Sequence, residues 1–239
     1  MGDSMVRTLL LALVVALSTI GSGMAGPFED GLAAYKRQDY ATALRLWKPL
    51  AEQGDARAQT RLGSTYVLGE GVPQDYAEAM QWYRKAAEQG HAPAQNNLGV
   101  MYEKGLGVRR DYAEAMQWYR KAAEQGDARA QHNLGVMYEK GLGVPQDYAE
   151  AVRLWKPLAE QGNADAQNNL GVMYENGQGV PQDYVLAHVW FNLSASRQTD
   201  PENRERTAKA RDRVAAKMTP AQITEAQRRA REWKPMPER

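Results

Sequence analysis

Apolar and polar positions along this chain follow a pattern that repeats every 36 residues. Residues 75–110 read DYAEAMQWYRKAAEQGHAPAQNNLGVMYEKGLGVRR, and residues 111–146 match them at 31 of 36 positions. A fixed period in this range is typical of stacked supersecondary units, each of which buries its apolar face against its neighbours. The sequence therefore predicts one elongated array rather than a single globular core. The Asp-Tyr dipeptide keeps the same phase throughout, with its tyrosines at Tyr40, Tyr76, Tyr112, Tyr148 and Tyr184.

The first half of each repeat predicts an amphipathic helix. Between residues 76 and 87, apolar side chains recur at the three- and four-residue spacing of one helical stripe. We expect Asp75 to cap the first turn, with Glu78 completing a capping-box pair, because a carboxylate and a glutamate at this spacing satisfy first-turn amides. Gly90 is expected to end the helix. The buried stripe is predicted to be Tyr76, Ala79, Tyr83, Ala86 and Ala87.

The second half of each repeat predicts a second helix. It is expected to begin at His91 and to end at Gly105. Three equivalents of His91 in the other repeats are good N-cap residues, namely Asp55, Asp127 and Asn163. The predicted buried stripe of this helix is Ala94, Leu98, Met101 and Tyr102.

The repeat phase divides the chain into a lead, an array and a cap. We expect a capping helix in residues 26–38 and a degenerate fifth repeat with a basic helical cap in residues 183–239. Within the cap, helices are predicted at about 202–218 and from the Thr219 cap to about Trp233, with Val214, Ile223, Ala226 and Trp233 packed inward. The four full repeats are 39–74, 75–110, 111–146 and 147–182.

Two motifs carry a family resemblance. The pattern Leu98-Gly99-x-x-Tyr102, followed by Tyr112-x-x-Ala115-x-x-x-Tyr119, resembles the tetratricopeptide signature. The 36-residue period and the G-x-G-V-x-x-D-Y linker make residues 28 to about 197 resemble the Sel-one-like repeat branch. The resemblance implies an all-α, right-handed superhelical solenoid of antiparallel helix pairs that works as a protein-interaction scaffold.

Residues 1–25 have the features of an export signal. Arg7 precedes an apolar run from Leu9 to Ile20, and Gly23-Met24-Ala25 offers the small residues that signal peptidases require. The run is shorter than the roughly 20 residues that span a bilayer, although an uncleaved anchor is the alternative. Either Met1 or Met5 could start the chain. We expect a mature periplasmic or secreted protein beginning near Gly26, without an integral membrane segment.

Composition argues against several functional classes. The chain has no cysteine, which excludes disulfides and thiol chemistry, and its net charge of +1 does not call for a nucleic-acid partner. The three histidines, His91, His132 and His188, do not recur at one repeat position and lack metal-ligand spacing. We therefore expect no enzyme activity, catalytic residue, cofactor or metal. Some cysteine-rich relatives are associated with β-lactam binding or hydrolysis, but none of their cysteines is present here.

The functional prediction rests on a polar ladder along the second helices. By resemblance to tetratricopeptide domains, these helices line a concave surface that holds an extended segment of a protein or peptide. Asparagine amides match the donors and acceptors of a peptide backbone, and basic side chains bind carboxylates. The alternative is that these are solvated residues duplicated with the repeat. The predicted partner-binding residues are Arg57, Arg61, Asn97, Lys104, Arg129, Asn133, Lys140, Asn169 and Asn176.

The C-terminal region adds a charge asymmetry. Residues 201–239 hold 11 basic and 6 acidic side chains, a net charge of +5. This is interpreted as a soluble end-cap, with a surface for an anionic envelope component as the alternative. We thus expect an exported adaptor, regulator or assembly factor of the bacterial envelope. A cell-wall-active or β-lactam-binding enzyme, and a self-associating structural module, remain as alternatives.

Overall fold

The computed structural model describes residues 26–237, so the predicted export signal in residues 1–25 lies outside the described residues. Regular secondary structure within the described range is entirely α-helical. None of these helices combines the length and the apolar character that crossing a membrane requires. The helices are α2 (Pro27–Lys36), α3 (Tyr40–Glu52), α4 (Ala56–Leu68), α5 (Tyr76–Glu88), α6 (Ala92–Lys104), α7 (Tyr112–Glu124), α8 (Ala128–Lys140), α9 (Tyr148–Glu160), α10 (Ala164–Asn176), α11 (Tyr184–Arg197), α12 (Pro201–Ala215) and α13 (Pro220–Glu232).

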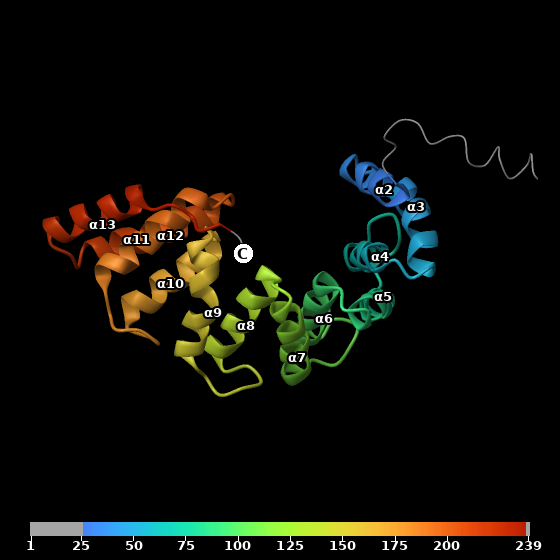
Figure 1. Ribbon diagram of the computed structural model, residues 1–239, viewed down its shortest axis with the longest axis horizontal. Helices are drawn as coiled ribbons and strands as arrows, with labels where there is room; N and C mark the ends of the chain where they lie inside the picture. Colours follow the sequence, from blue (N-terminus) through green and yellow to red (C-terminus); the bar gives the residue numbers. More distant parts are fainter. Residues whose placement is uncertain (1–25, 238–239) are drawn as a thin grey trace, which may run out of the picture.

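The helices pack in chain order and form an arc that runs from α2 at one end to α13 at the other (Figure 1). This is the predicted right-handed superhelical solenoid of antiparallel helix pairs. The second helices of the pairs, α4, α6, α8 and α10, lie on the inner side of the arc. Side-chain hydrogen bonds join successive second helices, whereas hollows open between the first helices α5, α7 and α9. A curved stack is compressed on its inside and spread on its outside, which explains this difference.

Local sequence signals set the helix ends as predicted. The Asp75 carboxylate accepts hydrogen bonds from the backbone amides of Ala77 and Glu78 at 2.9 and 3.0 Å. Asp55, Asp127 and Asn163 cap second helices in the same way, while His91 makes no side-chain cap. Gly105 ends α6 at φ +69°, a left-handed conformation that glycine adopts without a steric penalty.

The predicted role of Glu78 was wrong. Its carboxylate accepts a hydrogen bond from Nε1 of Trp82 at 2.9 Å instead of closing a capping box. Residues four apart share a helix face, so the side chain of Glu78 reaches the indole one turn later. Glu114 and Trp118 repeat this arrangement in α7, also at 2.9 Å.

A glycine in each second helix accommodates an aromatic ring of the following first helix. Gly63 faces Tyr83, Gly99 faces Tyr119 and Gly171 faces Phe191. The lead helix α2 repeats the relationship, since Gly31 lies against the indole of Trp47. Helix α2 therefore occupies the place of a second helix in front of the first repeat. The close approach of backbone to ring fixes the spacing between repeats.

The C-terminal cap covers the last helix pair. Val214 of α12 and Ala226 of α13 are fully buried, and Ile223 and Trp233 are half-buried, as expected of inward-facing residues. Beyond α13 the chain turns back, and the backbone amide of Met236 donates to the carbonyl of Glu160 in α9 at 2.8 Å. The guanidinium of Arg197 lies 4.4 Å from the centre of a ring of Trp233. The tail thus fastens the cap to the fourth repeat.

Candidate functional site: the inner face and its hollow

A hollow of about 340 Å³ lies at the N-terminal end of the inner face. We call it the inner hollow. It brings together four of the nine residues predicted to bind a partner, namely Arg57, Arg61, Asn97 and Arg129. They come from three successive second helices, α4, α6 and α8. The remaining lining residues are Phe28, Thr60, Ser64, His91 and Pro93.

The arginines of the inner hollow differ in how far they are already engaged. Arg57 pairs with Glu29 at 3.3 Å and with Asp55 at 3.4 Å, and its guanidinium lies 4.2 Å from the ring centre of Phe28. Arg129 pairs with Asp127 at 3.3 Å. Arg61 is exposed and makes no side-chain hydrogen bond or ion pair within residues 26–237. Arg61 is therefore the cation most available to an acidic ligand.

The floor of the inner hollow is a fixed hydrogen-bonded surface. The Tyr83 hydroxyl bonds to Ser64 at 3.0 Å, and burial raises the pKa of Tyr83, partly offset by Ser64 and Asn97. Oγ1 of Thr60 lies 2.8 Å from Nδ1 of His91, and burial lowers the pKa of His91. The histidine is therefore mostly neutral near pH 7. The positive charge of the hollow comes from its arginines.

Two of the predicted asparagines are used for contacts between repeats. Nδ2 of Asn133 donates to Oδ1 of Asn96 at 3.1 Å. Nδ2 of Asn169 lies 3.2 Å from Nε2 of His132, which accepts this bond as the neutral tautomer. Both asparagines are half-buried. Their side-chain nitrogens hold the inner face together, which leaves their oxygens as the groups that can face a ligand.

The remaining three predicted residues line neither the inner hollow nor the hollows between the first helices. Lys104, Lys140 and Asn176 are the exposed last residues of α6, α8 and α10. A basic residue in the last turn complements the helix dipole, so the two lysines have a structural reason to be there. Asn176 donates to Gln178 at 3.2 Å.

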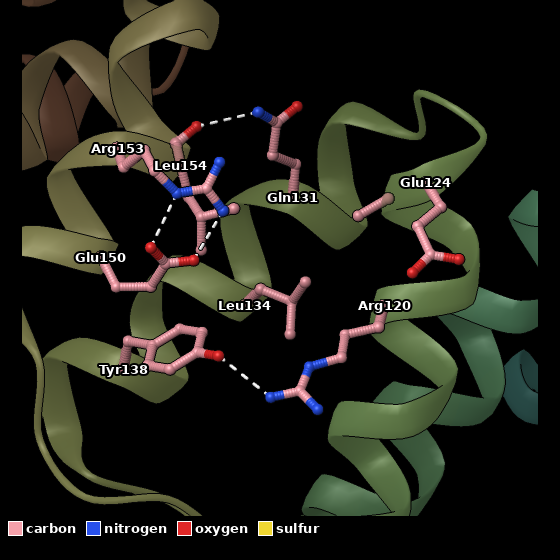
Figure 2. A pocket seen from close by; sticks show the side chains of 9 residues that line it. Arg120, Glu124, Gln131, Leu134, Tyr138, Glu150, Arg153 and Leu154 are labelled. Atoms are coloured by element: carbon pink, nitrogen blue, oxygen red, sulfur yellow. Dashed lines mark hydrogen bonds and ion pairs between the residues drawn. The ribbon is translucent and has the colours of Figure 1, made fainter.

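Sequence reasoning missed a second hollow, on the outer side of the arc. This outer hollow has a volume of about 380 Å³ and lies between α7, α8 and α9 (Figure 2). Leu134 and Leu154 line it, and the guanidinium groups of Arg120 and Arg153 stand at its edge. One sequence signal was available. Leu154 takes the position that Trp82, Trp118 and Trp190 hold in three other repeats, whereas the first repeat has Leu46 there.

Several basic side chains of the C-terminal cap are paired with acidic side chains of α10 or of the cap itself. Arg213 and Lys217 reach the buried carboxylate of Glu175 in α10, at 2.6 and 3.3 Å. The two hydrogen bonds from Arg213 hold the pKa of Glu175 below its usual range. Arg228 and Arg229 pair with Glu225 at 2.9 and 2.6 Å. These pairings reduce the positive surface that the net charge of this region suggests.

The described residues do not assemble a metal site, since no group of three or more histidine and acidic side chains comes close enough together. His91 bonds to Thr60, His132 contacts Asn169, and His188 is buried in α11. What the inner face offers chemically is binding, through arginines and amides beside an apolar wall.

Comparisons with known proteins match this architecture. The family model described as Sel1 repeat matches five consecutive stretches, residues 24–55, 56–91, 92–127, 128–163 and 164–198. Each stretch after the first joins a second helix to the following first helix, so the period agrees with the predicted repeats while the starting point differs. Comparison with curated proteins gives no match.

Among solved structures, a Sel1 repeat protein from Oxalobacter formigenes is 32% identical with a TM-score of 0.68, covering 84% of this chain and 86% of that one. A protective antigen of uropathogenic Escherichia coli with the same repeat fold is 30% identical with a TM-score of 0.55, covering 87% and 52%. A Sel1 repeat protein from Klebsiella pneumoniae subsp. pneumoniae is 23% identical with a TM-score of 0.53, covering 79% and 91%. With its contiguous repeats and their glycine-to-aromatic packing, this chain belongs to the Sel1 repeat family.

Proposed function

We propose that this protein is an exported scaffold of the bacterial envelope that binds another protein through its inner face. An extended, acidic segment of the partner lies along the second helices, and one of its carboxylates enters the inner hollow. The observation that carries this proposal is the convergence of Arg57, Arg61 and Arg129 beside the apolar wall of Phe28 and Pro93. Membership of the Sel1 repeat family supports a scaffold over an enzyme.

The roles within the inner hollow follow from its geometry. Arg61 is exposed and not engaged in an ion pair among the described residues, so it meets the incoming carboxylate first. Arg129 can exchange its 3.3 Å contact with Asp127 for a ligand oxygen, because its own side chain is 61% exposed and a single ion pair at the surface contributes little stability. The amide of Asn97 matches a backbone amide of the partner. Charge-assisted bonds of this type are stronger than neutral ones and add geometric specificity.

The decisive experiment is crosslinking of the protein in cells, followed by mass spectrometry, with two matched double variants. Arg61→Ala with Arg129→Ala removes two exposed cations from the inner hollow. Lys104→Ala with Lys140→Ala removes two exposed cations from second helices outside it. Circular dichroism first establishes that each variant folds. We expect the partner to disappear with the arginine variant and to persist with the lysine variant.

Equal retention of the partner by both variants would contradict binding in the inner hollow. Loss of the partner in both variants would indicate a nonspecific charge effect and would contradict the assignment of Arg61 and Arg129 as the binding residues. Two further measurements separate the alternatives. An adduct with labelled penicillin would favour an enzyme of the β-lactam type, and mass that rises with concentration in light scattering would favour self-association.

Export is tested separately. We expect the mature chain to be recovered from the periplasm or medium with an N-terminus near Gly26. Recovery of the intact chain from the membrane fraction, or from the cytoplasm, would contradict cleavage near Ala25 and with it the envelope location.

A further inference from the structure

The outer hollow corresponds to a position that a tryptophan fills at the other junctions between repeats. Trp82, Trp118 and Trp190 stand at equivalent places in α5, α7 and α11, always 36 residues or a multiple of 36 apart. Each packs from its first helix onto the apolar cluster of the preceding repeat. In α9 the same place is taken by Leu154. A hollow is also present one repeat earlier, where Trp118 lines it, but only at Leu154 do the floor residues Ala123, Gln131 and Leu134 line the hollow.

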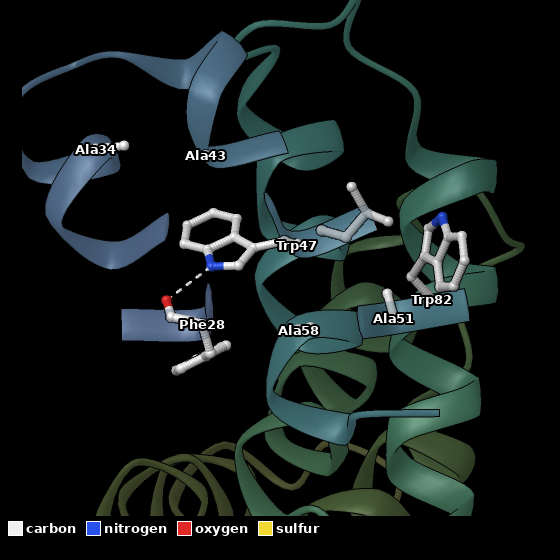
Figure 3. Close-up of a cluster of buried hydrophobic side chains, with 8 residues drawn as sticks. Phe28, Ala34, Ala43, Trp47, Ala51, Ala58 and Trp82 are labelled. Carbon is white, nitrogen blue, oxygen red and sulfur yellow. Dashed lines mark hydrogen bonds between the residues drawn. The ribbon is translucent and has the colours of Figure 1, made fainter. Parts of the chain in front are cut away.

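Two junctions show what the indole does there. Figure 3 shows the ring of Trp82 beside Ala51, in the cluster that also contains Trp47. At the next junction Trp118 packs on the cluster of Ala87 and Leu98, and Ala87 is only 2% exposed. Both indoles also donate from Nε1 to a glutamate one turn earlier, at 2.9 Å. The position therefore has an apolar floor and an acceptor for an indole N–H.

The junction with Leu154 retains the floor but leaves it uncovered. Ala123, the equivalent of Ala87, is half-buried, and so is Gln131, although its equivalent Gln95 is 5% exposed. Gln131 also bonds differently. Its Nε2 donates across the junction to the carbonyl of Leu154 at 3.1 Å, whereas Gln95 donates within its own repeat. The absence of the indole thus alters the junction over several residues.

The acceptor is retained as well. Glu150 is the equivalent of Glu114, and without an indole beside it the carboxylate accepts two hydrogen bonds from Arg153, at 2.7 and 2.6 Å (Figure 2). A carboxylate has about four lone-pair sites, so a further N–H can be accepted. Across the hollow, Arg120 is held by the hydroxyl of Tyr138 at 3.0 Å.

These groups complement the charge distribution of an indole. An aromatic ring is positive at its edge and negative on its face. The edge N–H suits the Glu150 carboxylate, and the face suits a guanidinium, which is attracted to a tryptophan ring within about 6 Å of its centre. The volume of the outer hollow is about 380 Å³. This volume falls within the range of about 300 to 1,000 Å³ seen for ligand sites.

We propose that the outer hollow is a docking site for a tryptophan side chain of another protein, which takes the place that Trp118 fills one repeat earlier. A second copy of this chain is not the source, because none of its six tryptophans is exposed. The hollow lies between first helices, on the side opposite the inner hollow, so this binding is separate from that proposed for the inner face.

The test uses N-acetyl-L-tryptophanamide as the probe and the methyl NMR signals of Ala123 and Leu134 as the readout, in the full mature protein. Leu154→Trp fills the hollow with a side chain of the protein itself. Tryptophan already occupies the equivalent position beside the equivalent glutamate in α5 and α7, so the variant is expected to fold. We expect progressive shifts of both methyl signals in wild type, loss of these shifts in Leu154→Trp, and smaller shifts with N-acetyl-L-leucinamide.

Unchanged methyl signals in wild type would overturn the proposal, as would equal shifts in Leu154→Trp or with the leucine probe. The Arg61→Ala and Arg129→Ala double variant serves as the matched control, because it changes the inner hollow alone. It should bind the probe as wild type does. Failure of inner-face crosslinking would leave this result unaffected, so the two proposals succeed or fail independently.

Discussion

Gly99 of α6 and Tyr119 of α7 approach so closely that a Cβ on the glycine would stand 2.5 Å from two carbons of the tyrosine ring. Tyr119 is fully buried by this contact, and its hydroxyl donates to Glu103 at 2.6 Å. The same helix thus supplies both the gap for the ring and the acceptor for its hydroxyl. Two adjacent repeats are held in register by one side chain.

Gly99→Ala should destabilise the protein by about 1 to 3 kcal/mol, since overpacking displaces a ring that has no space to move. Helix propensity alone predicts that Gly99→Ala stabilises the protein, because alanine in a helix is favoured over glycine by about 1 kcal/mol. Chemical denaturation decides between them. In a double-mutant cycle with Tyr119→Leu, the combined cost should fall below the sum of the two single costs. A stabilised Gly99→Ala variant would contradict the packing argument.

Alkaline pH should weaken the fold through Tyr119. Burial, with help from Glu103, raises the pKa of this phenol in the folded chain. Above pH 10 the unfolded chain releases the proton while the folded chain keeps it, so stability is lost as the pH rises, by about 1.4 kcal/mol at pH 11. The free energy of unfolding should therefore fall less between pH 8 and pH 11 in Tyr119→Phe than in the wild-type protein. Parallel decreases would argue against the assignment.

Acid should weaken the attachment of the cap through Glu175. Hydrogen bonds from Arg213 lower the pKa of this carboxyl in the folded chain, so its contribution is present above pH 4.5 and is lost as the pH falls. Glu175→Gln should cost about 1 to 3 kcal/mol at pH 7 and less at pH 3. Glu139→Gln is the matched control one repeat earlier, because the carboxylate of Glu139 forms no ion pair among the described residues. This variant should change the free energy of unfolding very little at either pH.

Trp190 and Trp118 should respond differently to loss of the indole N–H. Nε1 of Trp190 is buried without a partner among the described residues, because Leu186 stands where Glu114 serves Trp118. Trp118→Phe removes a satisfied bond, whereas Trp190→Phe removes an unsatisfied donor. We expect the former to cost about 1 kcal/mol more in thermal or chemical unfolding. Equal costs would indicate that Trp190 finds a partner.

The sequence by itself determined the parts of this protein that depend on neighbouring residues. The repeat period, the all-α class, the Asp75 cap, the glycine terminators and the buried stripe from Ala79 to Ala87 were all predicted and confirmed. Capping and helical periodicity act within one or two turns, so the residues responsible lie within a few positions of one another. The family resemblance had the same basis, since it rests on short motifs at fixed spacing.

Only the tertiary structure decided what equivalent residues do across a junction. Glu78 bonds to an indole rather than to the backbone, Asn133 and Asn169 join successive repeats, and four of the nine predicted binding residues meet in the inner hollow. Leu154 looked like one more apolar residue in the repeat, yet at its place Ala123 and Leu134 line the outer hollow. These outcomes depend on how closely residues about 36 apart approach, and that distance is set by the packing of whole helices and the curvature of the stack.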